Sequence, residues 1–363
     1  MSKNKQKPNS VLLITIFLLS FLGFLILTSV SMTMSKKFGY DAFHFLKHQV
    51  LFGYLPGFIL LAVAYNINLN LLKKLSFALI ILAIILMICV FIPGIGTSAG
   101  GATRWISFLG FTFQPSEFLK LSFIIYLSAW LSKHGKQKRF LKLFLPVLII
   151  ISIICFLLIA QPDISTLVIV ASIAVILYWC SETPLFHTLI LASAGVGGLI
   201  LLIRIAPYRL NRLLVFLRPE TEPLGIGYQL KQSLIAVGSG GLIGQGLGLG
   251  VQKFGFLPQP MTDTIFAVFA EETGFIGCII FILLLLIFSW QAFKIGKNTE
   301  NSFLRLMAVG IVCWFILQSF VNIGAVTGML PLTGIPLPLV SYGSSHLIME
   351  LFALGILLNI SKK

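Results

Sequence analysis

Residues 11–32 read VLLITIFLLSFLGFLILTSVSM, an apolar run without a single charged side chain. A helix needs about 20 such residues to cross the hydrocarbon core of a bilayer. Backbone groups cannot stay unpaired in lipid, so a run of this kind is predicted to be a helix. Comparable runs recur along the chain, at 49–65, 75–92, 116–131, 140–160, 164–180, 186–203, 264–290, 303–327 and 337–360. The sequence therefore predicts an all-α, polytopic membrane protein with about ten transmembrane helices.

The composition excludes an ordinary soluble protein. Hydrophobic residues make up 58% of the 363 residues and charged residues only 10%, whereas soluble domains carry about 25% charged residues. A net charge of +15 would suggest nucleic acid as the partner of a soluble protein, but here we expect the membrane instead and no nucleic acid. The five cysteines lie in apolar runs without a CxxC pair, and the five histidines lack ligand spacing, so no metal site is predicted.

The positions of Lys and Arg indicate the topology. Short cytoplasmic loops are enriched in these residues, and a cytoplasmic N-terminus places most of them on that side, although Lys36, Lys37 and Lys47 fall on the other. The cytoplasmic set is Lys3, Lys5, Lys7, Lys73, Lys74, Lys133, Lys136, Lys138, Arg139, Lys142, Lys294, Lys297, Arg305, Lys362 and Lys363. An even number of spans then places both termini in the cytoplasm.

One connection is much longer than the others. Residues 204–262, between the seventh and eighth spans, are predicted to form an extracytoplasmic loop, and long loops are often functional. Gly240, Gly244 and Gly248 repeat at four-residue spacing, which allows close packing against a helix. The run lacks the GK[ST] signature of a phosphate-binding loop.

Acidic residues at membrane depth are functional candidates because they are costly there. Asp263 lies at the outer mouth of the eighth span, where it is either a helix N-cap or a functional carboxylate. Asp163, after Gln161-Pro162, has the same two interpretations. Glu271 lies about two turns deeper and is expected to face the interior of the bundle.

Two further groups of charged residues require an interpretation. Glu117 and Lys120 have the i, i+3 spacing of an intrahelical ion pair, which would make both charges tolerable in lipid. Arg104, Arg209, Arg212 and Lys253 put positive charge on the outer side, against the usual bias, which favours attraction of an anion such as a phosphate. Trp105, next to Arg104, is either part of that site or an interfacial anchor.

The motifs, taken together in chain order, resemble the SEDS proteins (shape, elongation, division, sporulation) along nearly the whole chain. The matching stretches are GATRWISFLG (101–110), FQPSEFLK (113–120), QPD (161–163), RLLVFLRP (212–219), GYQLKQS (227–233), GGLIGQGLG (240–248), TDTIFA (262–267), EETG (271–274), PLVSYG (338–343) and GILLNIS (355–361). We therefore interpret residues 1–363 as a single SEDS transmembrane domain.

The resemblance implies a function. SEDS proteins are peptidoglycan glycosyltransferases that polymerise lipid II at the outer face of the bacterial inner membrane, together with a class B penicillin-binding protein. The motifs look closer to the division branch, FtsW, than to the elongation branch, RodA. A lipid II flippase and a non-catalytic scaffold of the cell-wall synthase remain the alternatives.

The resemblance also implies roles for residues. Asp263 stands at the position of the family's essential aspartate and is the expected general base. A substrate-binding role is expected for the polar residues Arg104, Trp105, Glu117, Lys120, Asp163, Arg209, Arg212, Gln229, Lys253 and Glu271. A divalent cation could assist the arginines, and the sequence does not decide this. Gln259 and Met261 replace the Glu and His that relatives commonly carry before the aspartate.

Overall fold

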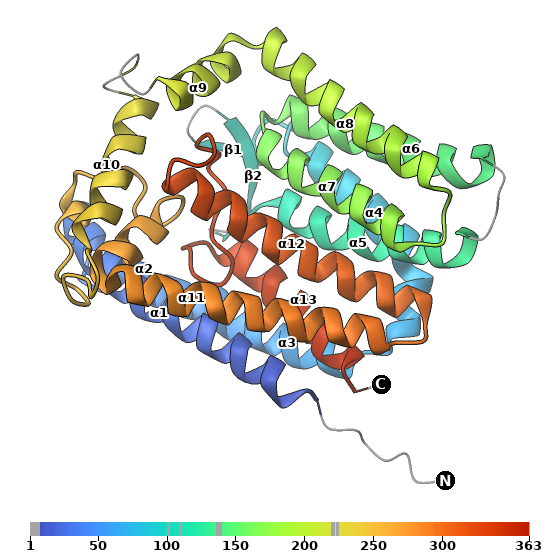
Figure 1. The fold of residues 1–363 in the computed structure, drawn as a ribbon, viewed down its shortest axis with the longest axis horizontal. Coiled ribbons are helices and arrows are strands. Elements are labelled where there is room, and N and C mark those ends of the chain that lie inside the picture. Colours follow the sequence, from blue (N-terminus) through green and yellow to red (C-terminus); the bar gives the residue numbers. More distant parts are fainter. Residues whose placement is uncertain are drawn as a thin grey trace.

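The computed structural model describes residues 8–99, 102–108, 111–135, 140–218, 222 and 225–362. Helices dominate these residues (Figure 1): α1 (Ser10–Lys37), α2 (His44–Gln49), the π-helix η1 (Val50–Tyr54), α3 (Leu55–Asn66), α4 (Leu69–Cys89), α5 (Pro115–His134), α6 (Phe140–Ala160), α7 (Ile164–Cys180), α8 (Leu185–Ile205), α9 (Pro207–Leu217), α10 (Ile226–Ser239), the 3₁₀-helix η3 (Gln252–Phe254), α11 (Ile265–Asn298), α12 (Ser302–Val326) and α13 (Ser344–Ile360). The strands are β1 (Gly96–Ala99), β2 (Ala102–Phe108) and β3 (Phe111–Phe113).

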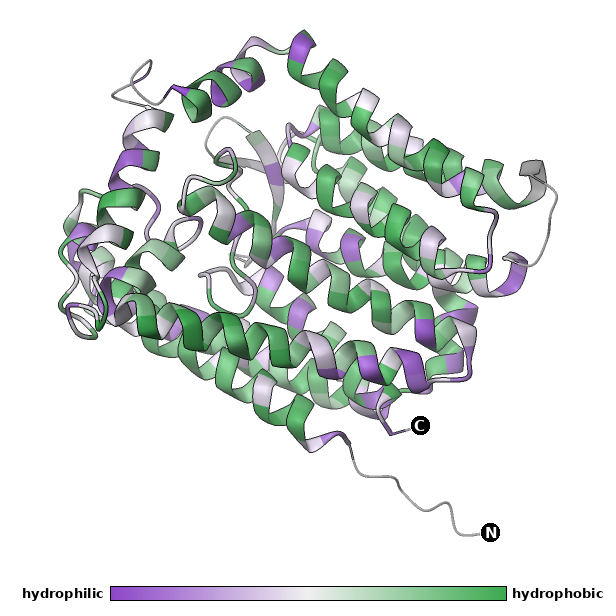
Figure 2. Cartoon of the chain, viewed as in Figure 1, coloured by the Kyte–Doolittle hydropathy of each residue, from purple (hydrophilic) through white to green (hydrophobic). Residues whose placement is uncertain are grey.

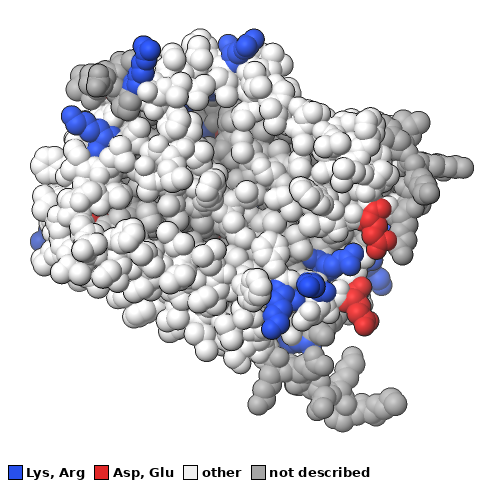
Figure 3. Space-filling view, in the orientation of Figure 1, with Lys and Arg blue, Asp and Glu red and all other residues white. Residues whose placement is uncertain are grey.

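The predicted spans all fall on helices. Within the described residues, seven helical segments are long and apolar enough to cross a membrane: α1, α2 to α3 taken together, α4, α6, α8, α11 and α12. The apolar helices α7 and α13 are shorter, and α5 carries a buried ion pair. Figure 2 shows apolar residues along the lengths of these helices. In Figure 3, Lys and Arg gather at two opposite ends of the molecule with a broad uncharged belt between them, as expected for a membrane protein.

The tenth span begins later than predicted. The sequence indicates a helix from residue 337, but α13 begins at Ser344, and the chain before it forms turns. The backbone explains the difference, because Leu339 and Gly343 have φ angles of +64° and +152°, which a right-handed helix does not contain. The apolar residues just before α13 are buried inside the protein. Their hydropathy is that of a membrane span, although they do not continue the helix.

Two connections that are predicted to be extracytoplasmic hold more secondary structure than expected. The connection between α4 and α5 forms a small antiparallel sheet in the order β1-β2-β3, with Ile106 paired to Gly96 on one side and to Phe113 on the other. The predicted loop 204–262 contains α9 and α10, which form an arch at one end of the bundle (Figure 1). Both features bring polar residues over the helix ends that lie away from the two chain termini (Figure 1).

The middle of the bundle is α12. It packs against α5, α7 and α11, and most of its side chains are buried.

At the end of the bundle where α1 begins and α13 ends, the Asn9 backbone N–H donates to Ser361 Oγ at 3.2 Å. The two ends of the chain are therefore on the same side. The charges predicted at residues 3, 5, 7, 136, 138, 139 and 363 lie outside the described residues.

The eighth predicted span is a broken helix. Gly274 inside α11 has φ +67° and ψ −168°, a conformation that only glycine adopts easily, and it separates a short N-terminal piece from a long C-terminal piece. The glycine-rich segment 240–250 supplies the hydrogen bonds that the break removes. Its backbone N–H groups at Gln245 and Gly246 donate to the carbonyls of residues 271 and 272 at 3.0 and 3.1 Å. Its carbonyls at residues 241 and 242 accept from the N–H groups of residues 275 and 276 at 2.9 and 3.0 Å.

This arrangement confirms the predicted close packing for two of the three glycines. Gly240 and Gly244 lie so close to the backbone of α11 that neither position has room for a Cβ atom. At Gly248 a Cβ atom would meet nothing within 4 Å, so close packing is wrong for that position. Its backbone N–H instead donates to Glu272 Oε2 at 2.9 Å.

Candidate active site

Asp263 lies in the turn before α11, at the end of the bundle opposite the two chain ends (Figure 1). The helix begins at Ile265, and the residue at the N-cap position is Thr264, whose side chain makes no cap hydrogen bond. The N-cap interpretation of Asp263 is therefore wrong. Its carboxylate is available for another role.

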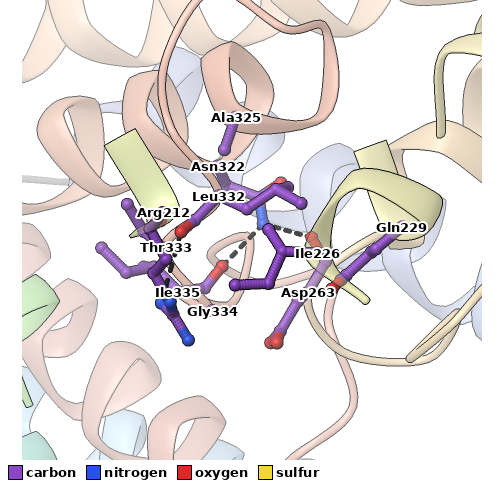
Figure 4. Close-up of a pocket in the computed structure, with 10 residues that line it drawn as sticks. All are labelled: Arg212, Ile226, Gln229, Asp263, Asn322, Ala325, Leu332, Thr333, Gly334 and Ile335. Carbon is purple, nitrogen blue, oxygen red and sulfur yellow. Dashed lines mark hydrogen bonds between the residues drawn. The ribbon is translucent and has the colours of Figure 1, made fainter. Parts of the chain in front are cut away.

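The Asp263 carboxylate lines a small cavity. The cavity has a volume of about 60 Å³, enough for a few water molecules or one substituent of a larger ligand. Its walls come from α9, α10, α12 and the segment that follows α12 (Figure 4). The other lining residues are Arg212, Ile226, Gln229, Asn322, Ala325, Leu332, Thr333, Gly334 and Ile335. Three of the predicted site residues, Arg212, Gln229 and Asp263, thus meet at one cavity.

The backbone around Asp263 is held from two sides. The Asn322 side chain on α12 donates from Nδ2 to the carbonyls of Asp263 at 2.9 Å and Ile335 at 2.6 Å. Ser341 Oγ donates to the Thr262 carbonyl at 2.6 Å, and the Tyr342 N–H donates to the Met261 carbonyl at 2.8 Å. These bonds join the turn before α11 to the segment between α12 and α13, which fixes the position of the carboxylate.

Gly334 lies beside the Asp263 carboxylate. It has φ +68°, in the left-handed region, and a Cβ atom built on it would lie 3.3 Å from Asp263 Oδ2. Any other residue would be strained there and would crowd the carboxylate. The segment after α12 can pass this close to Asp263 because residue 334 is glycine.

Burial raises the pKa of Asp263 above the usual aspartate value of 3.8. A hydrogen bond from the Thr262 side chain and the positive charges of Arg104 and Arg212 act in the opposite direction, and burial is the larger effect. A carboxylate with a raised pKa is a better proton acceptor than an ordinary surface aspartate. The nearby guanidinium groups favour negative charge at the same place.

The two arginines reach Asp263 from different elements. Arg212 is an exposed residue of α9, and its Nη1 donates to the Leu332 carbonyl at 3.3 Å. Arg104 is on β2; its Nε donates to the Gln161 carbonyl at 3.2 Å, and its Nη2 also donates to the Pro162 carbonyl. Trp105, its neighbour on β2, is partly buried and pairs with Thr97 of β1. Both positive charges therefore act on the Asp263 carboxylate, and Arg212 also lines the cavity.

Asp163 and Arg209 do not line the cavity. The Asp163 carboxylate accepts from the Thr166 N–H at 3.3 Å and from Thr166 Oγ1 at 2.8 Å, so the N-cap interpretation of this residue is confirmed. Arg209 donates from Nη1 to the Leu202 carbonyl at 3.0 Å and packs on the ring of Tyr208. Both contacts serve local structure, and a substrate-binding role for either residue stays a prediction.

Glu117 and Lys120 form the ion pair that their spacing predicts. Lys120 Nζ lies 2.9 Å from Glu117 Oε2, with both side chains almost completely buried. Lys120 also donates to Gln318 Oε1 at 2.8 Å and lies 4.8 Å from the centre of the Trp314 ring. Gln318 in turn donates to the Pro336 carbonyl at 3.0 Å. The pair is thus part of a buried polar network that supports the segment next to Gly334.

Glu271 and Lys253 belong to the junction at the break in α11. Glu271 Oε1 accepts from the N–H groups of Val251 and Gln252 at 2.8 and 3.1 Å. Lys253 Nζ lies 2.5 Å from Glu272 Oε1 and donates to Ser29 Oγ at 2.7 Å. Neither residue lines the cavity at Asp263. Their substrate-binding role stays a prediction, and their visible contacts hold the glycine-rich segment to α1 and α11.

The sequence analysis missed Asn322, Thr333 and Gly334 as cavity residues. A signal existed for Asn322, because an amide in the middle of an apolar span is costly and marks a buried polar contact. No comparable signal marks Thr333 or Gly334, whose place depends on a loop that returns to Asp263. Within the described residues, no group of three or more His, Cys, Asp or Glu side chains is placed to hold a metal ion.

Comparisons with known proteins identify the family of this chain. The family described as "Cell cycle protein", which covers FtsW, RodA and SpoVE, matches residues 9–363. The chain is 39% identical, over 97% of its length and 92% of the relative, to "Probable peptidoglycan glycosyltransferase FtsW" of Trichlorobacter lovleyi. It is 37% identical, over its full length and 99% of the relative, to "Stage V sporulation protein E" of Bacillus subtilis.

Solved structures share the fold. A chain from the structure titled "Structural coordination of polymerization and crosslinking by a peptidoglycan synthase complex" matches with a TM-score of 0.78 and 25% identity, over 98% of this chain and 97% of that one. The rod shape determining protein RodA of Thermus thermophilus matches with a TM-score of 0.72 and 24% identity, over 98% of this chain and 96% of that one. The motifs, the fold and the full-length matches lead to one conclusion: this chain belongs to the FtsW/RodA/SpoVE family, the SEDS proteins.

Proposed function

We propose that this chain is an inverting peptidoglycan glycosyltransferase that polymerises lipid II at the outer face of the bacterial inner membrane. The observation that carries the proposal is the cavity at Asp263, where a partly buried carboxylate lies beside Arg212 and within the field of Arg104. The names of the relatives support the same activity. The cavity opens at the end of the bundle away from the chain termini, where an outer-leaflet substrate would arrive if both termini are cytoplasmic.

The chemistry of the proposed reaction matches these groups. The 4-hydroxyl of a GlcNAc attacks the anomeric carbon of MurNAc, a C–O bond forms, and the bond to undecaprenyl pyrophosphate breaks with inversion. Asp263 takes the proton of the attacking hydroxyl as general base. The leaving pyrophosphate gains negative charge, which Arg104 and Arg212 stabilise. Because the leaving group is already activated, one carboxylate suffices, without the second carboxyl group of glycoside hydrolysis.

Asp263→Asn tests the proposal. The change keeps the shape of the side chain and removes the base, so polymerisation of labelled lipid II should fall by about 10²-fold or more. Burial makes the charged form of Asp263 costly in the folded protein, so the variant should unfold at the same temperature as the wild type or higher.

Glycan chain length on a gel and thermal unfolding in detergent give the two readouts. Normal polymerisation by a well-folded Asp263→Asn protein would refute the mechanism. It would instead favour the flippase or scaffold interpretation of the fold.

We propose further that the chain works with a class B penicillin-binding protein and belongs to the division branch. A structural relative comes from a peptidoglycan synthase complex, and several relatives carry the name FtsW. Copurification from detergent with the division and the elongation penicillin-binding proteins tests both statements. Preference for the elongation partner would overturn the branch assignment, and capture of neither would overturn the partnership.

A further inference from the structure

Two polar atoms at the cavity lack a partner within the described part of the chain. They are the side-chain amide oxygen Oδ1 of Asn322 and the hydroxyl Oγ1 of Thr333, both shielded from solvent. Both residues line the cavity, and Asn322 is only 2% exposed. Buried polar atoms are nearly always hydrogen-bonded, because leaving one unpaired is costly. Two such atoms at one cavity, next to Asp263, indicate that something else completes their bonds.

The contacts of Asn322 settle which of its two terminal atoms is free. An amide group looks almost the same when it is turned over, so its orientation has to be assigned from its partners. Here the Asn322 amide faces two carbonyl oxygens, those of Asp263 and Ile335, which can only accept. The NH₂ group must therefore face them, and the unpaired atom is the oxygen, which can only accept a hydrogen bond.

Thr333 is anchored through its backbone, which leaves its hydroxyl available. Its carbonyl accepts a 2.7 Å hydrogen bond from Ser165 Oγ at the start of α7. Figure 4 shows Thr333 and Arg212 on one side of the cavity and Asp263 on the other, with Asn322 between them. Three elements thus meet around one small space. Thr333 lies in the segment held by Ser165 of α7, Asp263 in the turn before α11, and Asn322 on α12.

We propose that Asn322 Oδ1 and Thr333 Oγ1 form a subsite for the acceptor sugar, which binds one neutral hydrogen-bond donor beside the hydroxyl that Asp263 deprotonates. This inference rests on the proposed function. An amide oxygen requires a donor, and because Arg212 offsets the negative charge of Asp263 at the same cavity, a neutral donor is favoured over a cation. A cavity of about 60 Å³ holds one substituent but no sugar ring. A sugar hydroxyl or the acetamido N–H of GlcNAc meets all three requirements.

Thr333→Val is the decisive variant, with Thr333→Ser as its matched control. Valine keeps the shape of threonine and removes only the hydroxyl, which has no described protein partner. The folded protein therefore loses no internal bond, and its thermal unfolding temperature should not fall. The KM for lipid II should rise roughly 5- to 10-fold with little change in kcat, because a substituent bound equally in ground and transition states affects KM alone. Thr333→Ser keeps the hydroxyl and should behave like the wild type.

Substrate analogues identify the group that is bound. Wild-type and Thr333→Val proteins are compared on lipid II analogues that lack, one at a time, the 3-hydroxyl, the 6-hydroxyl or the acetamido N–H of GlcNAc. For the group that occupies the subsite, the effects of removing it and of removing the Thr333 hydroxyl should not add. Additive effects for all three analogues, or an unchanged KM for Thr333→Val, would overturn the subsite. Neither result touches the role of Asp263, which Asp263→Asn tests separately.

Discussion

The buried ion pair of Lys253 and Glu272 is expected to contribute a measurable part of the free energy of unfolding. Lys253 Nζ lies 2.5 Å from Glu272 Oε1, with side chains 1% and 0% exposed, and also donates to Ser29 Oγ and the Gly248 carbonyl at 2.7 Å. Lys253→Met removes the cation and leaves the Glu272 carboxylate buried without its charge partner. Breaking a buried pair in this way typically costs about 3–5 kcal/mol. We expect the unfolding temperature in detergent to fall by roughly 5–10 °C.

A double variant separates the loss of the pair from the loss of the side chain. Lys253→Met combined with Glu272→Gln leaves no uncompensated charge, so most of the lost stability should return. The exposed pair of Lys47 and Asp41, 3.8 Å apart, provides the control. Lys47→Met should change the free energy of unfolding by about 1 kcal/mol or less.

Unfolding is followed by tryptophan fluorescence during heating, and each sample is also assayed for glycan synthesis. An unfolding temperature for Lys253→Met equal to that of the wild type would refute the buried pair. A stable Lys253→Met protein with weakened use of lipid II would instead support the predicted substrate-binding role of Lys253.

Three other perturbations test separate parts of the site. Because burial raises the pKa of Asp263, the acidic limb of the pH–activity profile should lie above the usual 3.8, and activity should be lost as the pH falls and the base is protonated. Arg212→Gln removes a stabilising cation and should move that limb to still higher pH. An unmoved limb would contradict the coupling between Arg212 and Asp263. Gly334→Ala should cost about 1–2 kcal/mol of stability and reduce polymerisation, because its Cβ crowds Asp263 Oδ2; full activity would show that the carboxylate has free room. Single cysteines at the exposed positions Ser239 and Glu300, in a background without native cysteines, should differ in labelling by an impermeant thiol reagent in intact cells, with only Ser239 labelled; the reverse pattern would invert the topology.

Hydropathy was sufficient to predict where the helices lie but not where each one begins. The run that starts at residue 337 is as apolar as a span, yet it is buried inside the protein and its backbone is not helical at Leu339 and Gly343, so the helix begins only at Ser344. The break at Gly274 was equally invisible, because a glycine inside an apolar run reads as helix unless its partner segment is known. Helix boundaries here depend on tertiary contacts that a local pattern does not contain.

The candidate site was predicted in part. Asp263, Arg212 and Gln229 stand in motifs, and the structure brings them together. Asn322 and Thr333 reach the cavity because segments far apart in the chain contact each other, and no local pattern specifies those contacts. Lys120 stands in a motif that suggested substrate contact; its visible partners are buried side chains, and a substrate-binding role for it stays a prediction.

The break in α11 also constrains how the protein is made. Ribosomes produce the glycine-rich segment before α11, so the groups that complete the break already exist when this helix enters the membrane. Until that segment docks, the backbone groups at residues 271, 272, 275 and 276 lack the four hydrogen bonds that it supplies. Unpaired groups of this kind cost several kcal/mol each in lipid. Insertion of α11 and docking of the preceding segment are therefore coupled steps of biogenesis, and a lesion in the segment would be detected as failed insertion of an otherwise unaltered helix.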